Sequence, residues 1–295
     1  EIANLPHLRG RRATTTDTRV LHRLLRRAEY RHLHVDWRLP ADWLDTPGAV
    51  LVETAESHPA GPGHLRACLA VGADPPPAAW VRIFALYHAG QARSLLETML
   101  EWVIPYLRRE GVAQLGWLPR EGLPPGWVEA TGFRLINHVE TFVKEGVNPP
   151  EAAEPNRAVK IRPVQAGDFP RLAAIEAEAF DPLWRHSEDS LRRGWQNARS
   201  FHVALLDGEI VGFQYSADSD HRHAVHLVRL TVSPRVQRIG IGSTLMIAAL
   251  DSYRRQGVQR VSLNTQADNF ASRCLYQKFD FKTAGQQLPV WCLDL

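Results

Sequence analysis

Apolar and polar residues in the second half of the chain alternate with a strand-like period in some segments and a helix-like period in others. Asp207 and Gly208 mark a tight hairpin turn, because this dipeptide tolerates positive φ angles. Gly257 ends the long helix before it. The predicted elements are a strand at 159–164, a helix from Asp168 to Phe180, a hairpin at 201–216, a strand at 224–232, a helix from Gly240 to Gln256, a strand at 258–265, a helix from Asn269 to Lys278, and closing strands at 281–285 and 289–295.

The first half predicts the same order of elements, and two short matches align the halves. Arg108–Val112 matches Arg254–Val258, 146 positions later. Gly132 with Phe133 matches Asp280 with Phe281, 148 positions later. Both matches fall at a helix end or a strand start, which indicates an internal duplication.

A segment without apolar periodicity separates the two halves. Residues 147–156 (VNPPEAAEPN) are rich in Pro, Glu and Ala, as in a linker between domains. We therefore predict an α/β fold in two copies, each a central, mostly antiparallel twisted sheet flanked by helices. The predicted boundaries are 1–146 for the first copy, 147–157 for the linker and 158–295 for the second copy.

Composition places the chain among ordinary folded proteins, with 44% hydrophobic and 23% charged residues. No apolar run approaches the length of a membrane span, and no signal peptide is evident, so we expect a cytoplasmic protein without a membrane partner. Cys68, Cys274 and Cys292 are too scattered for a disulfide framework or a zinc site. We expect no metal.

The net charge of +3 does not by itself argue for a polyanionic partner. Arginines gather near the N-terminus, which indicates either a nucleic-acid patch or a solvated helix face, and the second is favoured because no binding motif accompanies them. They are Arg9, Arg11, Arg12, Arg19, Arg23, Arg26, Arg27 and Arg31.

The strongest candidate for chemistry is the turn between the strand at 224–232 and the next helix. Gln237, Gly240 and Gly242 lie on this turn. The first N–H groups of a helix lack intrahelical acceptors, and the helix dipole adds positive charge, so backbone alone can hold a pyrophosphate. Glycine removes the β-carbons that would keep phosphate oxygens away.

Two other phosphate-binding motifs fail on their residues. A Walker loop requires a Lys directly after its last glycine, and no Lys lies near Gly242. A dinucleotide fingerprint requires a third glycine where Leu245 stands, and an acidic residue where Arg260 stands.

The pattern Gln237, Gly240, Gly242 after a strand resembles the coenzyme A loop of the GNAT (GCN5-related N-acetyltransferase) superfamily. Downstream, Asn269, Leu275 with Tyr276, and Phe281 continue the family pattern, so the resemblance covers residues 159–295. One residue departs from it: Asp280 stands where the family usually has Gly, which puts the geometry of that turn in doubt.

The resemblance implies that the second copy binds acetyl-CoA where two central strands splay apart. The pantetheine arm would pair with the backbone of Leu230, Thr231 and Val232, and Asn269 would contact the pantetheine or help hold the cofactor. Gln237 belongs to the same loop pattern. The pyrophosphate would lie on the amides of Arg238, Ile239, Gly240, Ile241, Gly242, Ser243 and Thr244.

The resemblance also assigns the general acid. Tyr276 would donate a proton to the departing thiolate, the alternative being a core tyrosine packed against Leu275 and Phe279. For the base, His221, His223 and His226 lie near or on the strand before the loop, and only alternate residues face the cleft. We take His226 as the candidate, with a water chain as the alternative.

The first copy lacks the glycines of the loop. With the offset of 146, Gly240 corresponds to Ser94 and Gly242 to Leu96, whose side chain would occupy the pyrophosphate space; with 148, Tyr276 corresponds to Val128. We therefore expect a degenerate first copy that has lost its cofactor site.

These observations favour an N-acetyltransferase that moves an acetyl or short acyl group from acetyl-CoA to a primary amine by direct attack in a ternary complex. The acceptor is a small molecule or a peptide, with a pocket built from residues 181–199 and 286–290. The alternative is a non-catalytic coenzyme A-binding or scaffolding module. We expect a monomer or a homodimer, and a nucleic-acid partner is not favoured.

Overall fold

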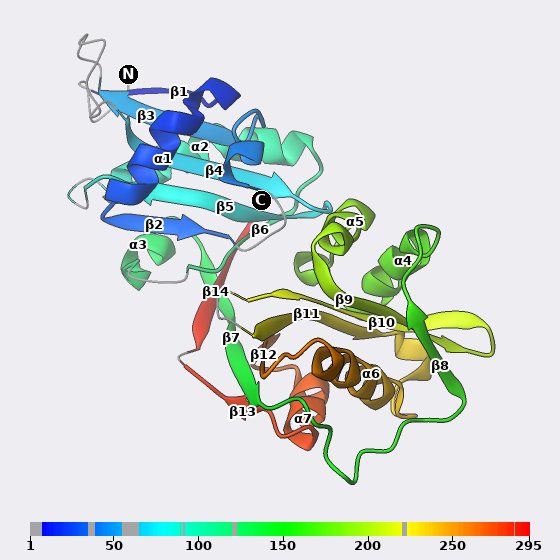
Figure 1. Cartoon of the computed structure of the whole chain (residues 1–295). Coiled ribbons are helices and arrows are strands. Elements are labelled where there is room, and N and C mark those ends of the chain that lie inside the picture. The colour runs from blue at the N-terminus through cyan, green and yellow to red at the C-terminus, as the bar shows by residue number, and fades with distance from the viewer. Residues whose placement is uncertain are drawn as a thin grey trace. The chain divides into compact units, whose positions relative to one another are not determined.

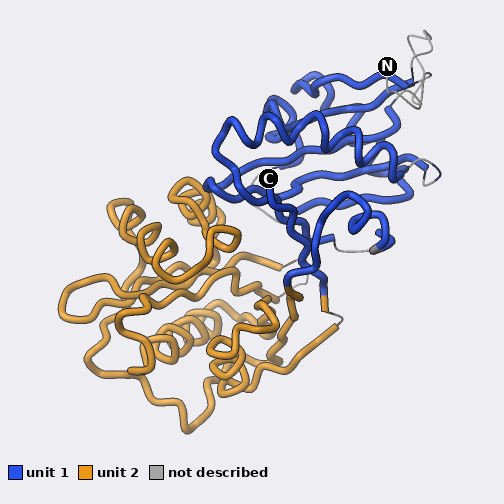
Figure 2. Tube along the Cα trace, turned by 180° about the vertical axis from the view of Figure 1, so that it is seen from behind, with its two compact units in different colours: residues 1–136, 288–295 blue, residues 137–287 orange. Residues whose placement is uncertain are grey.

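The computed structural model describes residues 8–34, 39–54, 65–88, 90, 92–119, 123–219, 223–285 and 287–295. The chain divides into two compact units (Figure 2). Unit 1 comprises Glu1–Ile136 and Leu288–Leu295, and unit 2 comprises Asn137–Gln287. Among the described residues, no helix has the length and apolar character needed to cross a bilayer.

Unit 1 is a mixed sheet with helices on both faces (Figure 1). Its strands follow the order β1-β3-β4-β5-β6-β14, and β2 pairs with β5. The strands are β1 (Leu8–Arg12), β2 (Tyr30–Leu33), β3 (Ala49–Thr54), β4 (Leu65–Ala73), β5 (Ala78–Leu86), β6 (Gln114–Trp117) and β14 (Leu288–Asp294). The helices are η1 (Thr15–Asp17), α1 (Thr18–Arg27), η2 (Pro40–Trp43), α2 (Ala92–Arg109) and α3 (Pro125–Ala130).

Unit 2 has the same architecture, with the strand order β7-β12-β11-β10-β9-β8, and β13 pairs with β7. The strands are β7 (Arg134–Glu145), β8 (Val159–Pro163), β9 (Ala198–Leu206), β10 (Glu209–Asp218), β11 (Ala224–Val232), β12 (Arg260–Gln266) and β13 (Lys282–Thr283). The helices are α4 (Phe169–Ala179), η4 (Pro182–Trp184), α5 (Glu188–Gln196), η5 (Pro234–Val236), α6 (Ile241–Arg255) and α7 (Phe270–Lys278).

The closing strand of each unit comes from the other half of the chain. In unit 2, β7 pairs antiparallel with β12 from Arg260↔Glu145 to Gln266↔Val139. In unit 1, the final strand β14 pairs antiparallel with β6, and Trp291 lies opposite Trp117. The predicted boundaries 1–146 and 158–295 stay a prediction, and each compact unit takes its closing strand from the other predicted copy.

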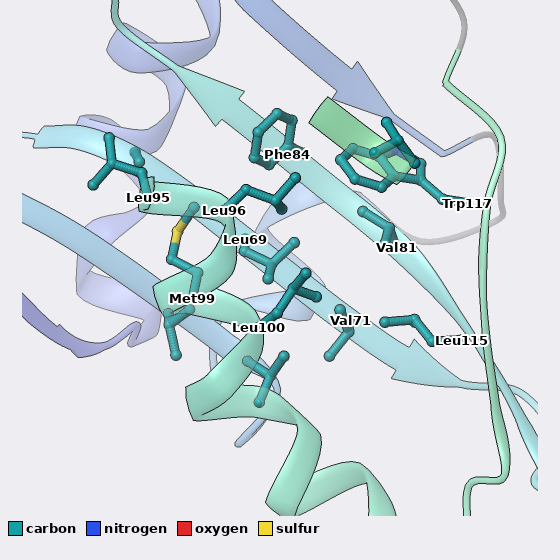
Figure 3. Close-up of a cluster of buried hydrophobic side chains, with 14 of the residues drawn as sticks. Leu69, Val71, Val81, Phe84, Leu95, Leu96, Met99, Leu100, Leu115 and Trp117 are labelled. Atoms are coloured by element: carbon teal, nitrogen blue, oxygen red, sulfur yellow. The ribbon is translucent and has the colours of Figure 1, made fainter. Parts of the chain in front are cut away.

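Helices cover each sheet because its central strands, such as β5 and β10, are buried on both faces. In unit 1, α2 turns a stripe of apolar side chains toward alternate residues of β4 and β5 (Figure 3). The stripe includes Leu95, Leu96, Met99, Leu100 and Val103, a spacing that puts them on one helix face. The other alternating set of β4 and β5 packs with α1. In unit 2, α6 and α7 share one core with β11 and β12, whereas α4 packs on β10 and β11 and α5 packs on β9 and β10.

Each unit has an Arg–Asp ion pair just before its first α-helix. The guanidinium of Arg11 donates two hydrogen bonds to Asp17, at 2.8 and 2.7 Å, and that of Arg162 donates two to Asp168, at 2.7 and 2.9 Å. Asp168 stands at the N-cap position, as predicted, but its carboxylate accepts from the N–H of Gln165 rather than from the helix. Arg162 lowers the pKa of Asp168 by this hydrogen bonding, against the opposing effect of burial.

The predicted elements of the second half are present, and the 3₁₀ turns η4 and η5 and the helix α5 are additional. Asp207 and Gly208 have φ angles of 51° and 87° between β9 and β10, which confirms the hairpin turn. Helix α5 was not predicted, although Ser187 caps it by accepting from the N–H of Ser190, and Glu188 with Asp189 favours its first turn. Asp280 adopts φ 62°, the left-handed conformation that glycine favours, so the turn keeps its geometry without glycine.

Candidate active site

The loop between β11 and α6 has the form of an anion site. Gly240 is the N-cap of α6 with φ 86°, a left-handed conformation, and no side chain caps the helix there. Arg238 also has a positive φ, 66°. Because the first amides of α6 have no intrahelical acceptor and no capping side chain, they are available to a ligand. The side chains of Gln237, Arg238 and Ile239 are exposed.

The space around Gly242 is small. A β-carbon at this position would lie 3.3 Å from Leu275 Cδ2, 3.8 Å from Leu230 Cδ2 and 3.9 Å from Val232 Cγ2. These contacts bring together the start of α6, the end of β11 and α7. Of the residues predicted to hold the cofactor, Leu230 and Val232 thus lie beside Gly242.

Asn156 of the linker and Lys278 of α7 contact the loop. The N–H of Asn156 donates to Thr244 Oγ1 at 2.9 Å, and Asn156 Nδ2 donates to the carbonyl of Ile239 at 2.7 Å. Lys278 Nζ lies 3.5 Å from Ser243 Oγ. The sequence analysis placed residue 156 in the linker only. Nothing in a Pro-rich segment indicates that its Asn contacts a loop more than 80 positions further along the chain.

The strands β11 and β12 form a fork. They pair in parallel from Ala224↔Arg260 to Leu227↔Leu263, and then the pairing stops although both strands continue. On its other edge β11 stays paired with β10 as far as Val232↔Gly212. A β-bulge at the end of the paired part, between Tyr215 and Ser216 of β10, changes the register. Among the described residues, β11 therefore has no strand partner on the β12 side from Val228 to Val232, and alternate residues of this stretch direct their backbone groups to that side.

Tyr276 lies in the core of unit 2, on α7. Its ring centroid is 6.0 Å from those of Phe142 and Phe281, and the residue is buried. Burial raises the pKa of its phenol, and hydrogen bonding to Ser272 acts in the other direction. The phenol therefore keeps its proton at neutral pH.

The candidate bases lie apart from Tyr276. His226 is half-buried on β11, and its Nδ1 is 2.9 Å from Ser262 Oγ on β12, in the paired part of the two strands. Its neighbours Val225 and Leu227 pack in the core that contains Tyr276, so alternation places His226 on the opposite face of the sheet. His223 is exposed in the turn before β11, and His221 lies outside the described residues.

Asn269 has a structural role at the start of α7. It is the N-cap of α7, and its Oδ1 accepts from the N–H of Ser272 at 3.1 Å. Its side-chain amide also has an NH₂ group, which the cap does not use and which can donate hydrogen bonds. Asn269 also lines the pocket described below.

A buried ion pair supports β11 beside the fork. Glu176 on α4 is fully buried, and its carboxylate accepts from Arg229 Nε at 3.0 Å and from Thr231 Oγ1 at 2.7 Å. Burial raises the pKa of Glu176, but the charge and hydrogen bonds of Arg229 outweigh it and hold the pKa below its ordinary value. Arg229 also stacks over the Phe180 ring at 3.9 Å. Sequence reasoning missed this pair, because the two residues are far apart along the chain.

A pocket of about 490 Å³ opens between the end of α4 and the end of β12. Its lining is mainly polar, with two exposed carboxylates, those of Asp181 and Asp268. Asp268 Oδ1 accepts from Asn137 Nδ2 at 2.8 Å. The pocket is lined by Asn137, Ala177, Glu178, Ala179, Phe180, Asp181, Trp184, Arg185, Gln266, Asp268 and Asn269. Asp181, Trp184 and Arg185 belong to the segment predicted to build an acceptor pocket.

The fold, the fork and the loop agree with a family match. Residues 169–281, which contain the loop, Asn269 and Tyr276, match the model of the acetyltransferase (GNAT) family. This part of the chain is therefore similar to GNAT acetyltransferases.

The chain is also similar to individual proteins, in sequence to one and in structure to two others. The chain is 25% identical over 160 residues to the mycothiol acetyltransferase of Renibacterium salmoninarum, which covers 50% of this chain and 47% of the relative. A GCN5-related N-acetyltransferase from Sphaerobacter thermophilus superposes with a TM-score of 0.62 at 18% identity over 98% of this chain and 96% of its own. A tandem GNAT protein from the clavulanic acid biosynthesis pathway has a TM-score of 0.60 at 12% identity over 97% and 98%.

These likenesses carry different information. The two structures cover almost the whole chain, and they confirm the predicted fold of two tandem GNAT copies. The sequence match is shorter, since it spans less than half the length of the mycothiol acetyltransferase.

Proposed function

We propose that unit 2 moves an acetyl or another short acyl group from acetyl-CoA to a primary amine, by direct attack of the amine in a ternary complex. The observation that carries this proposal is the open edge of β11 beside the uncapped start of α6. An extended pantetheine arm has amide groups that can pair with a strand edge, and its pyrophosphate suits free helix amides.

The residues of the loop and fork fit this co-substrate. Backbone groups of Leu230, Thr231 and Val232 would hold the pantetheine arm, and the amides from Arg238 to Thr244 would hold the pyrophosphate. The left-handed φ of 86° favours glycine at position 240, and at position 242 even a β-carbon would lie 3.3 Å from Leu275 Cδ2.

Tyr276 supplies the proton for the leaving group. The amine nitrogen attacks the thioester carbonyl carbon, and the C–N bond forms as the carbonyl becomes an oxyanion. A backbone N–H of the open β11 edge stabilises this charge. When the C–S bond breaks, the electron pair goes to sulfur, and the Tyr276 phenol donates a proton to the thiolate.

The attacking nitrogen must also lose a proton. His226 is our candidate base. It lies in the paired part of the strands, where its Nδ1 contacts Ser262, rather than in the open part of the fork, so it would act through water. The pocket of about 490 Å³ is our candidate acceptor site, because it lies between the residues that follow the fork on β12 and the helix that covers β11. Its exposed carboxylates, Asp181 and Asp268, favour an acceptor that carries a positive charge before it reacts.

Coenzyme A binding tests the proposal. We expect Gly242→Leu to abolish coenzyme A binding in calorimetry, because the new side chain fills the space between α6, β11 and α7. The matched control is Gly167→Leu, since Gly167 is exposed, belongs to the same unit and has no atom within 4 Å of a β-carbon built on it. Full affinity in Gly242→Leu would contradict the assigned loop.

Turnover separates an enzyme from the alternative, a non-catalytic coenzyme A-binding module. Acetyl-CoA mixed with a panel of primary amines releases free thiol if the chain is an enzyme. Binding without thiol release from any amine would favour the binding module. The cytoplasmic location and the monomeric or homodimeric state stay predictions.

A further inference from the structure

The same fork exists in unit 1, and there the chain itself fills it. Strands β5 and β6 pair in parallel from Ala78↔Gln114 to Trp80↔Gly116. In unit 2 the corresponding pairing begins at Ala224↔Arg260, 146 positions further on in both strands. The fork of unit 1 is therefore the repeat of the fork in unit 2.

The bulge also repeats at this offset. In β5 the register changes between Ile83 and Val81, so Arg82 is the extra residue. In β11 the change between Arg229 and Leu227 leaves Val228 as the extra residue, 146 positions after Arg82. Residues 83–86 of β5 thus correspond to residues 229–232 of β11, where we place the pantetheine arm.

Residues 83–86 are not open. Strand β2 pairs antiparallel with them, from Tyr30↔Leu86 to Leu33↔Ile83 (Figure 1). It lies on the same edge of β5 that pairs with β6 at residues 78–80. The N–H of His34 extends this pairing by donating to the carbonyl of Arg82 at 2.8 Å. The backbone groups of β5 that would meet a pantetheine arm already have partners from the same chain.

The side chains of β2 anchor it in this place. His32 is buried, and its Nε2 donates to the carbonyl of Val81 at 3.0 Å. The His32 ring lies 6.3 Å from that of Trp117 at the end of β6, so β2 spans the space between β5 and β6. The Tyr30 ring contacts Trp127 edge to face at 4.9 Å.

The segment that forms β2 in unit 1 has a different structure at the corresponding place in unit 2. Strand β2 starts at Tyr30, shortly after α1 ends at Arg27, and η4 starts at Pro182, at the same distance from the end of α4 at Ala179. In unit 2 this segment forms a turn of helix that contributes to the pocket. In unit 1 it extends along the fork.

We propose that β2 occupies in unit 1 the place that the pantetheine arm of coenzyme A occupies in unit 2, so that unit 1 is closed to the cofactor by its own backbone. The inference rests on the proposed function for the unit 2 half of the comparison. Each chain then binds one coenzyme A molecule, and restoring loop glycines in unit 1 does not create a second site while β2 stays in the fork.

Hydrogen exchange of the intact protein tests the filling of the fork without relying on activity. Without ligand, we expect peptides covering residues 83–86 to exchange slowly, since β2 and β4 pair with both edges of β5. Addition of coenzyme A leaves their rate unchanged, whereas peptides covering residues 229–232 exchange roughly tenfold more slowly. Fast exchange at 83–86 without ligand, or slowing there on addition of coenzyme A, would overturn the proposal.

Stoichiometry supplies the second measurement. Calorimetry with coenzyme A should give one site per chain for the wild type and for Gly167→Leu, and none for Gly242→Leu. Two sites in the wild type, or one remaining in Gly242→Leu with slowed exchange at 83–86, would overturn the closure of unit 1. A wild type that binds no coenzyme A, yet exchanges slowly at 83–86, would contradict the proposed function and leave β2 in the fork.

Discussion

A phenol assists a departing thiolate only while it keeps its proton. Tyr276 is buried between Phe142 and Phe281, and this burial raises the pKa of its phenol above the ordinary value of 10.0. The aromatic core therefore does two things: it fixes the ring, and it keeps the acid protonated through the physiological range. A packing role and a chemical role are compatible at this residue.

Replacing Tyr276 with Phe removes the hydroxyl and keeps the packing. We expect kcat to fall by about a hundredfold, with coenzyme A affinity little changed, because the proton is needed only as the C–S bond breaks. Thiol release measures the rate, and calorimetry measures the affinity. Tyr253→Phe is the matched control, since Tyr253 is another buried tyrosine of this core, on α6. Unchanged turnover in Tyr276→Phe would contradict the assignment.

Glu176 shows the opposite case, a buried acid held in its charged form. Its folded pKa lies below the ordinary value of 4.5, so its contribution to stability is present above that value and is lost as the pH falls through the lower folded pKa. Arg229, Thr231 and the N–H of His186 supply the compensating hydrogen bonds.

Glu176→Gln leaves the guanidinium of Arg229 buried without its charge partner. We expect a loss of about 3–5 kcal/mol in the free energy of unfolding at neutral pH, measured in urea, with a smaller loss at acid pH where the wild-type carboxylate is itself protonated. Glu188→Gln is the control: it breaks an exposed i,i+4 pair with Arg192 and should cost less than about 1 kcal/mol. Equal losses in both variants would contradict a special role for the buried pair.

At the scale of elements, two helices of unit 2 differ in the capping of their N-termini. Helix α6 starts at Gly240 without a side-chain cap and keeps its amides for a ligand, whereas α7 starts at Asn269, which caps it. An uncapped start costs stability, and a bound anion restores it. The contrast in capping explains why the same unit has one helix start suited to an anion and one suited to rigidity.

Asn269 variants separate the cap from contact with the cofactor. Asn269→Ala should lower the free energy of unfolding by about 1 kcal/mol, whereas Asn269→Ser keeps a capping oxygen and most of the stability. Coenzyme A affinity should fall in both variants, because both lack the amide donor. Urea unfolding and calorimetry measure the two effects. An Asn269→Ser protein with wild-type affinity would leave Asn269 with the capping role alone.

At the scale of the whole molecule, the exchanged closing strands join the stability of each unit to the other half of the chain. Trp291 of β14 is 4% exposed and packs in the core of unit 1, although it lies near the end of the chain. Loss of the Trp291 side chain should therefore destabilise unit 1, although Trp291 belongs to the second predicted copy of the sequence.

Trp291→Ala should cost about 3–5 kcal/mol of stability, and faster hydrogen exchange should appear in β5 and β6 rather than in β11 and β12. Trp195→Ala serves as the control: Trp195 is 39% exposed on α5, where it contacts Phe169, so its replacement should cost less and affect unit 2. Faster exchange confined to unit 2 in Trp291→Ala would contradict the exchange of strands.

Much of this molecule can be predicted from its sequence. Periodicity, the Asp207–Gly208 turn and the helix ends identify the elements, and the glycines at 240 and 242 identify the loop, because φ preferences and capping act over a few residues. The duplication is also visible, and its offset of 146 holds for the strand register of both forks. The short helix α5 was missed although its capping residues are present in the sequence.

Only the tertiary structure decided which segment completes each strand edge. Strand β7 rather than β14 lies beside β12, β2 fills one fork while the other stays open, and Leu96, assigned from the sequence to a blocked phosphate site, packs in the core of unit 1. A strand edge accepts any extended segment that can reach it with a compatible buried face, so the outcome depends on competition among segments far apart along the chain. Local preference determines what a segment can form, and packing determines where it pairs.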